Sequence, residues 1–172
     1  SLPNSVNILQ TNEFDYEIID NTTTTSMSGI TTAAVSTSKG LRIKGKLSSC
    51  SKTQYIIWKQ YTIDGTTYPV LEIGDGTNCF DANAVDVTIV AAKKINANAF
   101  NGANTLVNVV LPQNLTTVGA YAFAGTGLTQ INIPSRVSEL NATTAFSKCF
   151  NLTNIYVNKV NGTYAGIDGV LY

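Results

Sequence analysis

The sequence predicts a strand-dominated solenoid, in which short repeats stack side by side behind a β-rich N-terminal segment. Residues 106–127 are followed at once by a close copy, residues 128–151. An apolar triplet with one fixed spacing recurs through the second half of the chain, and a second signature that ends in phenylalanine alternates with it. Because a unit of this length is too small to bury its own apolar face, the copies must stack on one another.

Residues 1–69 are expected to form a lead-in, residues 1–12, and a β-rich cap. Phe14, Tyr16 and Ile18 alternate with polar residues, which predicts a half-buried strand. The following stretch, residues 20–40, is rich in Thr and Ser and is compatible with either strand or loop.

Residues 41–47 alternate strictly between apolar and polar positions. Arg42, Lys44 and Lys46 fall on one face of the predicted strand. This pattern indicates a basic edge, whose charges keep an exposed strand from pairing with other chains. An ordinary solvated strand face is the alternative to a ligand site here.

A hairpin is predicted next, with residues 54–63 as one arm and residues 66–73 as the other. Asp64 and Gly65 stand between them, and this pair supplies the positive φ angles that tight hairpin turns require. Trp58 is expected to pack under the cap as a core residue.

Residues 70–172 hold the repeats. Each predicted strand carries three apolar residues with the spacing L-x-x-I-x-L, and we expect parallel strands about 4.8 Å apart, each coil touching only its neighbours. The four triplets are Ala84, Val87 and Ile89; Leu106, Val109 and Leu111; Leu128, Ile131 and Ile133; and Leu152, Ile155 and Val157.

The second signature is an apolar residue followed by Ala or Cys and then Phe. The phenylalanine is expected to anchor the interior, and the residue before it is small because neighbouring coils approach closely there. Pro112 and Pro134 directly follow the last strand residue, where a missing N–H ends the ladder. The signature recurs as Ile73, Cys79 and Phe80; Ile95, Ala99 and Phe100; Val118, Ala122 and Phe123; and Leu140, Ala145 and Phe146.

Together these residues read L-x-x-I-x-L-P-x-x-L-x-x-I-G-x-x-A-F-x-x-C, which resembles the Treponema-type leucine-rich repeats of BspA-like bacterial surface proteins. The match runs from about residue 68 to the C-terminus, and FDYEI, GTTYPVLEIGDG and YAGIDGVLY resemble segments that flank such arrays. Cys79 and Val90 depart from the usual Ala and Pro, and the motif breaks off after Val157, which leaves open whether the array caps itself or continues.

The resemblance implies a strand-dominated α/β fold, a right-handed leucine-rich-repeat solenoid of about four to five repeats. It also implies an exported, non-enzymatic bacterial protein of the cell surface, used for adhesion to host matrix or to other cells. The N-terminus has no basic region followed by an apolar core, so we expect that any export signal has been removed.

Composition excludes several classes of function. Eleven basic and eleven acidic residues give zero formal net charge, and no Lys/Arg run is present to follow phosphates, so nucleic acid is not an expected partner. No apolar run reaches the length of about eighteen residues that predicts a transmembrane helix. Cys50, Cys79 and Cys149 are too few for a disulfide framework and are expected to be buried, reduced thiols.

Catalysis and metal binding have little support in the residues. The chain has no histidine, so Ser-His-Asp and Cys-His sites and imidazole metal ligands are excluded. Paired carboxylates are the remaining route to an enzyme acting on glycans, with Glu72 as the first residue to test. A calcium loop needs a denser series of oxygen ligands than residues 74–78 offer with Asp81 and Asp86. We therefore expect no cofactor and no metal. The acidic clusters are Glu13, Asp15 and Glu17, expected to stay solvated, and Glu72 with Asp75.

The candidate binding surface is the exposed face of the strand ladder, because residues between the buried triplets point there. Asn, Gln and Tyr suit sugar hydroxyls or a polar protein surface, and the alternative is an ordinary solvated sheet. The face measures roughly 240 Å², less than the 800 Å² or so that one partner buries in a standard protein interface. Its residues are Asp86, Thr88, Asn108, Val110, Gln130, Asn132, Asn154 and Tyr156.

The sequence thus predicts a cell-surface or extracellular adhesion module without enzymatic activity. Its expected partners are a host extracellular-matrix protein, a protein of another cell surface, or a glycan. The alternative is a structural spacer or attachment domain that has no ligand of its own.

Overall fold

The computed structural model describes residues 13–25, 34–80, 83–158, 166–167 and 170–171. Its elements are almost all strands, and the described residues contain one short helix, α2 (Ala142–Ala145), which the side chain of Asn141 caps at its N-terminus. The predicted lead-in, residues 1–12, lies outside the described residues.

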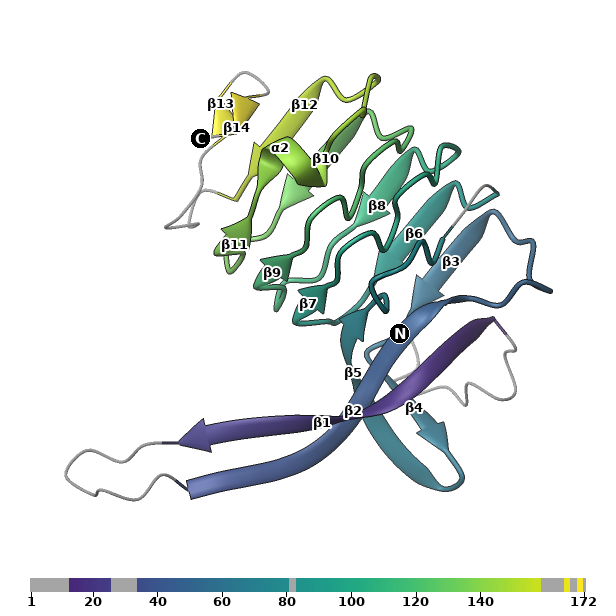
Figure 1. The fold of residues 1–172 in the computed structure, drawn as a ribbon, viewed down its shortest axis with the longest axis vertical. Coiled ribbons are helices and arrows are strands. Elements are labelled where there is room, and N and C mark those ends of the chain that lie inside the picture. Colours follow the sequence, from purple (N-terminus) through teal and green to yellow (C-terminus); the bar gives the residue numbers. More distant parts are fainter. Residues whose placement is uncertain (1–12, 26–33, 81–82, 159–165, 168–169, 172) are drawn as a thin grey trace.

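The predicted strand ladder is present and begins one strand earlier than the sequence indicates. Figure 1 shows its strands running side by side along the body of the molecule. Tyr55 and Ile57 stand in register with Val87 and Ile89, so residues 54–57 supply the first apolar pair. The five strands are β3 (Gln54–Ile57), β6 (Asp86–Ile89), β8 (Asn108–Val110), β10 (Gln130–Ile133) and β12 (Asn154–Val157), and β3, β6 and β8 form one parallel sheet while β10 and β12 form another.

The predicted hairpin is confirmed for its second half only. β4 (Gln60–Ile63) pairs antiparallel with β5 (Thr66–Ile73), and Asp64 and Gly65 take φ angles of 48° and 80° in the turn. The prediction that residues 54–63 form a single arm is wrong, because the strand is interrupted at Trp58 and β4 begins only at Gln60. The Trp58 N–H donates to the Tyr61 hydroxyl, 3.0 Å away, and its partly buried ring packs against the core as expected.

A second parallel ladder lines the other side of the coils. Ile73, Ile95, Val118 and Leu140 stand in register across it, and each is buried. β5 starts in the hairpin and ends in this ladder, so the cap and the repeats share one strand. The ladder consists of the end of β5 followed by β7 (Lys94–Ile95), β9 (Thr117–Val118) and β11 (Glu139–Leu140).

The phenylalanines of the second signature form a continuous stack through the interior. The ring centroids of Phe80 and Phe100 lie 4.8 Å apart, those of Phe100 and Phe123 lie 5.3 Å apart, and their planes differ by 19° and 6°. Phe146 continues the stack at 5.9 Å from Phe123. The prediction that these rings anchor the interior is confirmed, because Phe80, Phe100 and Phe123 are fully buried and Phe146 packs against the core. Stacked rings also gain interaction energy beyond that of burial alone.

Asn and Thr side chains connect each coil to the one before it. The Asn96 amide donates to the Gly74 carbonyl at 2.7 Å, and the Thr105 hydroxyl donates to the Ala84 carbonyl at 2.8 Å. The side-chain oxygen of Asn114 accepts from the Ala92 N–H at 3.1 Å. These bonds satisfy backbone groups where the coils have no regular ladder, which explains the abundance of Asn and Thr.

The prediction of a basic edge strand at residues 41–47 is wrong. β2 (Ala34–Lys46) lies between β1 (Phe14–Thr25) and β5, so it is an interior strand of its sheet. Arg42 meets carboxylates from both neighbours, since it bonds to Glu72 at 2.7 Å and to Glu17 at 3.0 Å, and Lys44 pairs with Asp15 of β1 at 3.7 Å. The charges that appeared to repel other chains therefore connect three strands of this one.

β1 also departs from the predicted alternation. Phe14 is buried and Tyr16 is half-buried, but Ile18 is 40% exposed. The pairing register shifts between Asp15 and Tyr16. Beyond Ile18 and Leu41, where β2 no longer pairs with β5, β1 and β2 leave the body of the molecule as a two-stranded ribbon (Figure 1).

The remaining predictions concern the thiols and the C-terminal segment. Cys50, Cys79 and Cys149 are free, as predicted, but the prediction that they are buried is met only in part, because each is partly exposed. β13 (Gly166–Ile167) and β14 (Val170–Leu171) pair antiparallel near the end of the chain. Among the described residues, no helix is long and apolar enough to cross a membrane.

Replacing Phe123 by Ala should lower the free energy of unfolding by about 3–5 kcal/mol, because the change removes a ring from the middle of the stack and leaves a cavity. Chemical denaturation measures the loss. Phe150→Ala is the matched control: its side chain is 89% exposed, and the same truncation should change stability by less than about 0.5 kcal/mol. Equal losses in the two variants would contradict the stacked core.

Alkaline pH should destabilise the fold. Burial raises the pKa of Cys79 from 9.0 to about 11 and that of Tyr61 from 10.0 to about 12. For each group, at a pH between its ordinary pKa and its raised pKa, the unfolded chain has lost a proton that the folded chain keeps. The free energy of unfolding therefore falls as pH rises through that range. Denaturation at a series of pH values should show little change in stability between neutral pH and pH 9 and a decline above pH 9, and the variant Cys79→Ala should reduce the slope between pH 9 and 11. An unchanged slope in that variant would show that Cys79 does not contribute.

Candidate functional site

Two columns of side chains run across the exposed face of the first ladder. The parallel register places Asp86 beside Asn108 and Thr88 beside Val110. On the other two strands, Gln130 stands beside Asn154 and Asn132 beside Tyr156. β3 adds Gln54 and Ile56 to the same columns, next to Asp86 and Thr88.

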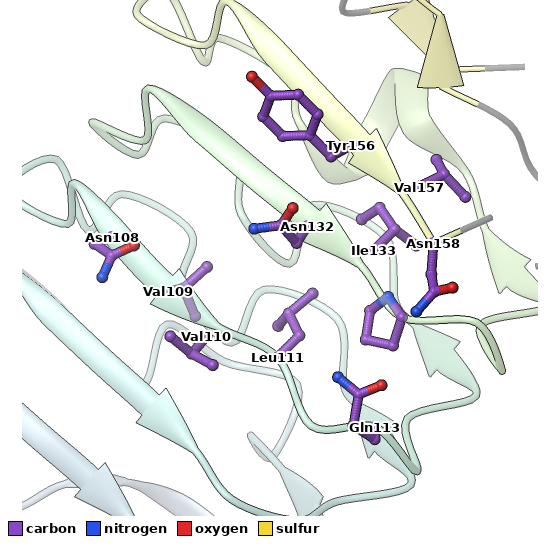
Figure 2. A pocket seen from close by; sticks show the side chains of 11 residues that line it. Asn108, Val109, Val110, Leu111, Gln113, Asn132, Ile133, Tyr156, Val157 and Asn158 are labelled. Atoms are coloured by element: carbon purple, nitrogen blue, oxygen red, sulfur yellow. The ribbon is translucent and has the colours of Figure 1, made fainter. Parts of the chain in front are cut away.

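A hollow of about 410 Å³ lies on this face, over β8, β10 and β12. Its floor is apolar and comes from buried residues of the triplets, such as Leu111 and Ile133. Figure 2 shows Val110, Asn132 and Tyr156 following one another across the three strands, with Gln113 and Asn158 beyond the strand ends.

The hollow coincides with two local features of the backbone. β8 and β10 belong to different hydrogen-bonded sheets, so the ladder is interrupted between them. Pro112 and Pro134 follow the ends of these strands and start turns, in which Leu115 and Val137 donate to their carbonyls. Of the two prolines that the sequence marks as strand terminators, Pro134 contributes to the lining of the hollow.

Tyr156 is the largest side chain at the hollow, and one hydrogen bond within the chain holds its hydroxyl group. The Asn154 amide donates to the Tyr156 hydroxyl at 2.8 Å, two residues away on the same face of β12. The ring remains 48% exposed, as does the side chain of Val110. An oriented aromatic ring and an exposed aliphatic side chain thus stand at opposite sides of Asn132.

The polar groups of the hollow are neutral. The amides of Asn108, Gln113 and Asn132 make no hydrogen bond within the described part of the chain. No charged side chain of a described residue lines the hollow. The site can therefore donate and accept hydrogen bonds, and among its described lining residues the Tyr156 hydroxyl is the one ionisable side-chain group.

Of the eight predicted site residues, half line the hollow: Asn108, Val110, Asn132 and Tyr156. Asn154 does not line the hollow but donates a hydrogen bond to the Tyr156 hydroxyl. Asp86, Thr88 and Gln130 lie elsewhere on the face. Gln113 and Asn158 were missed because the repeat spacing marks only positions between buried strand residues, and these two follow the strand ends. Their positions in the repeat could have identified them, because Gln113 directly follows Pro112 and Asn158 directly follows Val157, the last residue of its strand.

The acidic clusters are engaged in bonds that hold the fold. Glu72 accepts from Arg42 and from the Asn96 amide, at 2.7 and 3.3 Å. The Thr77 hydroxyl donates to Asp75 at 2.5 Å and, with the Thr77 N–H, holds the pKa of Asp75 below its usual value.

Of the N-terminal acidic residues, Asp15 and Glu17 stay solvated as predicted, with side chains 57% and 50% exposed, whereas the Glu13 side chain is only 16% exposed. Glu13 pairs with Lys52, Asp15 with Lys44 and Glu17 with Arg42. Asp81 lies outside the described residues, and no group of three or more potential metal ligands occurs among those described.

Comparison with protein families supports the repeat assignment. Residues 74–166, just over half of the chain, match the model of the BspA type leucine rich repeat region in six copies. The chain belongs to the BspA-type leucine-rich repeat family. The predicted family and the predicted solenoid are thereby confirmed. None of the curated proteins compared with this BspA-type chain matches it significantly.

Solved structures of leucine-rich repeat proteins resemble this BspA-type chain. A protein from Bacteroides capillosus is 28% identical with a TM-score of 0.60, and the match covers 69% of this chain and 87% of that one. The Treponema pallidum leucine rich repeat protein is 22% identical with a TM-score of 0.49, over 67% and 63% of the two chains. A leucine rich cell surface protein from Faecalibacterium prausnitzii is 22% identical with a TM-score of 0.43, and the match covers 77% of this chain but only 54% of that protein.

Proposed function

We propose that this BspA-type chain is a non-enzymatic adhesion or binding module that works at the cell surface or outside the cell. It engages its partner, a host matrix protein, another cell or a glycan, through the exposed face of the first ladder. The observation that carries the proposal is the hollow, where unpaired amides surround an exposed, oriented tyrosine.

A contrast in polar bonds between the hollow and the junction of the cap with the second ladder supports this site. In the second ladder and the cap, the polar side chains of Asn96, Glu72 and Arg42 are bonded to other parts of the chain. Around the hollow, the side-chain amides of Asn108, Gln113 and Asn132 are not bonded within the described part of the chain. Polar groups that bond within the fold stabilise it, whereas unpaired groups beside exposed apolar side chains are available to a partner.

The same contrast argues against catalysis. Glu72 and Asp75, the carboxylates closest to a glycosidase pair in the sequence, are bonded to Arg42 and Thr77 and lie outside the hollow. A glycosidase needs one carboxyl group that carries a proton near neutral pH. The pKa of Asp75 is shifted in the opposite direction.

The small size of the face favours one alternative, a structural spacer without a ligand. The strand face offers roughly 240 Å², so a tight protein interface would need additional surface from the cap or from further repeats. A spacer would show no saturable binding to any of the partner classes.

Surface plasmon resonance against host matrix proteins, mucin and a glycan set tests the proposal. A variant carrying Val110→Glu, Asn132→Lys and Tyr156→Ala should lose at least about tenfold in affinity, because it alters the centre of the proposed site while conserving net charge. The control variant carries Lys93→Glu, Glu139→Lys and Phe150→Ala, three exposed positions outside the hollow, and also conserves net charge.

Binding that both variants retain would place the site elsewhere. Absence of saturable binding to every probe would favour the spacer. Circular dichroism and thermal unfolding of each variant show whether a loss of binding reflects a loss of fold.

A further inference from the structure

We infer that the hollow over β8, β10 and β12 binds an uncharged carbohydrate, namely one or two neutral sugar rings at the end or branch of a larger glycan. This inference rests on the proposed function and names the ligand class of the same site. Four properties of the hollow support it: its charge, its hydrogen-bonding groups, its aromatic ring and its size.

The charge of the hollow selects against ionic ligands. Among the described residues, its lining contains Asn, Gln and Tyr as polar side chains and no Asp, Glu, Lys or Arg. An anionic sugar or a charged peptide would lose part of its hydration on entering and would meet no opposite charge there. A neutral polyol loses less hydration free energy, and hydrogen bonds to the amides can offset that loss.

The amides match the hydrogen-bonding pattern of sugar hydroxyls. A side-chain amide offers two donors and an acceptor, and a hydroxyl both donates and accepts. Asn108, Gln113 and Asn132 have this capacity unused, and they come from a strand, a turn and the next strand, so that they surround the hollow from different directions. A ligand with several neighbouring hydroxyls can bond to more than one of them at once.

Tyr156 provides the apolar contact that sugars also need. A pyranose ring has one face covered by C–H groups, and this face gains dispersion energy when it lies against an aromatic ring. The ring of Tyr156 is 48% exposed, and its hydroxyl is held by Asn154. A ring that is already oriented loses little conformational entropy when a ligand packs on it.

The size of the hollow fits a small ligand. Its 410 Å³ falls at the lower end of the range of about 300–1,000 Å³ that is typical of small-molecule sites. The apolar floor formed by Leu111 and Ile133 lies under the polar rim, as expected where a sugar turns one face to the protein. A short oligosaccharide can therefore occupy the site without the larger contact area that a folded protein requires.

The experiment uses the whole chain on an array of neutral and anionic glycans, followed by calorimetry with the best neutral oligosaccharide. Lactose and sialyllactose form one matched pair that differs in charge. We expect saturable binding of neutral glycans, with a Kd that changes less than about twofold between low and high salt, because no ion pair is involved.

Three variants test the assigned groups. Tyr156→Ala should weaken binding by at least about tenfold, whereas Tyr156→Phe, which keeps the ring, should weaken it by about threefold or less. Asn132→Ala should weaken binding by about 3- to 10-fold through the loss of hydrogen bonds. Asn104→Ala is the control, because Asn104 is an exposed amide that does not line the hollow, and it should bind like the unchanged chain.

The outcomes separate this inference from the proposed function. Salt-sensitive binding of anionic glycans alone would overturn the inference. Binding of a deglycosylated matrix protein at this face, with no competition from neutral sugars, would also overturn the inference. The proposed function would stand in that case. Saturable binding of neutral glycans that Tyr156→Ala leaves unchanged would also overturn the inference. If neither glycans nor proteins bind, both the inference and the proposed function fail.

Discussion

The structure depends on one constraint: a coil of about 22 residues cannot bury its own apolar side chains and must use the coils beside it. Each coil gives a triplet to the first ladder and a phenylalanine to the central stack, and both are complete only when a neighbour is present. Phe100 and Phe123 are fully buried between rings, whereas Leu152 and Ile155, in the last described coil, are only partly buried. Stability is therefore a property of neighbouring pairs, and a defect in one coil is felt by the coils on either side.

The same constraint leaves one face of each strand without a structural task. Residues that alternate with the buried triplet point away from the core, and the parallel register aligns them into columns. Elsewhere, Asn and Thr side chains satisfy backbone groups between coils, and ion pairs connect the cap to the second ladder through Arg42. Around Asn132, the strand face has neither side-chain hydrogen bonds to backbone groups nor ion pairs among the described residues. A repeat fold of this kind can change its surface groups without changing its core, which is why family membership does not specify a ligand.

Much of the fold was predictable because the repeat spacing directly reports which residues are buried. The triplets, the stacked phenylalanines and the terminating prolines are all local patterns with one structural solution. The errors have a different origin. Residues 41–47 were read as an edge because a strand's alternation does not reveal what lies on either side of it, and the pairing of Arg42 with Glu17 and Glu72 spans 25 and 30 residues. Residues 54–57 were assigned to a hairpin because a single short strand carries no repeat signal of its own.

The hollow itself could be predicted only in part. The spacing identifies Asn132 and Tyr156 as exposed, but not the interruption between β8 and β10 or the approach of Gln113 from its turn. The most direct measurement is a two-dimensional ¹H–¹⁵N NMR spectrum of the chain during titration with the neutral oligosaccharide that binds best. The account predicts saturable shifts in the side-chain NH₂ signals of Asn108, Gln113 and Asn132. Shifts confined to the cap or the second ladder, with those three signals unmoved, would contradict it.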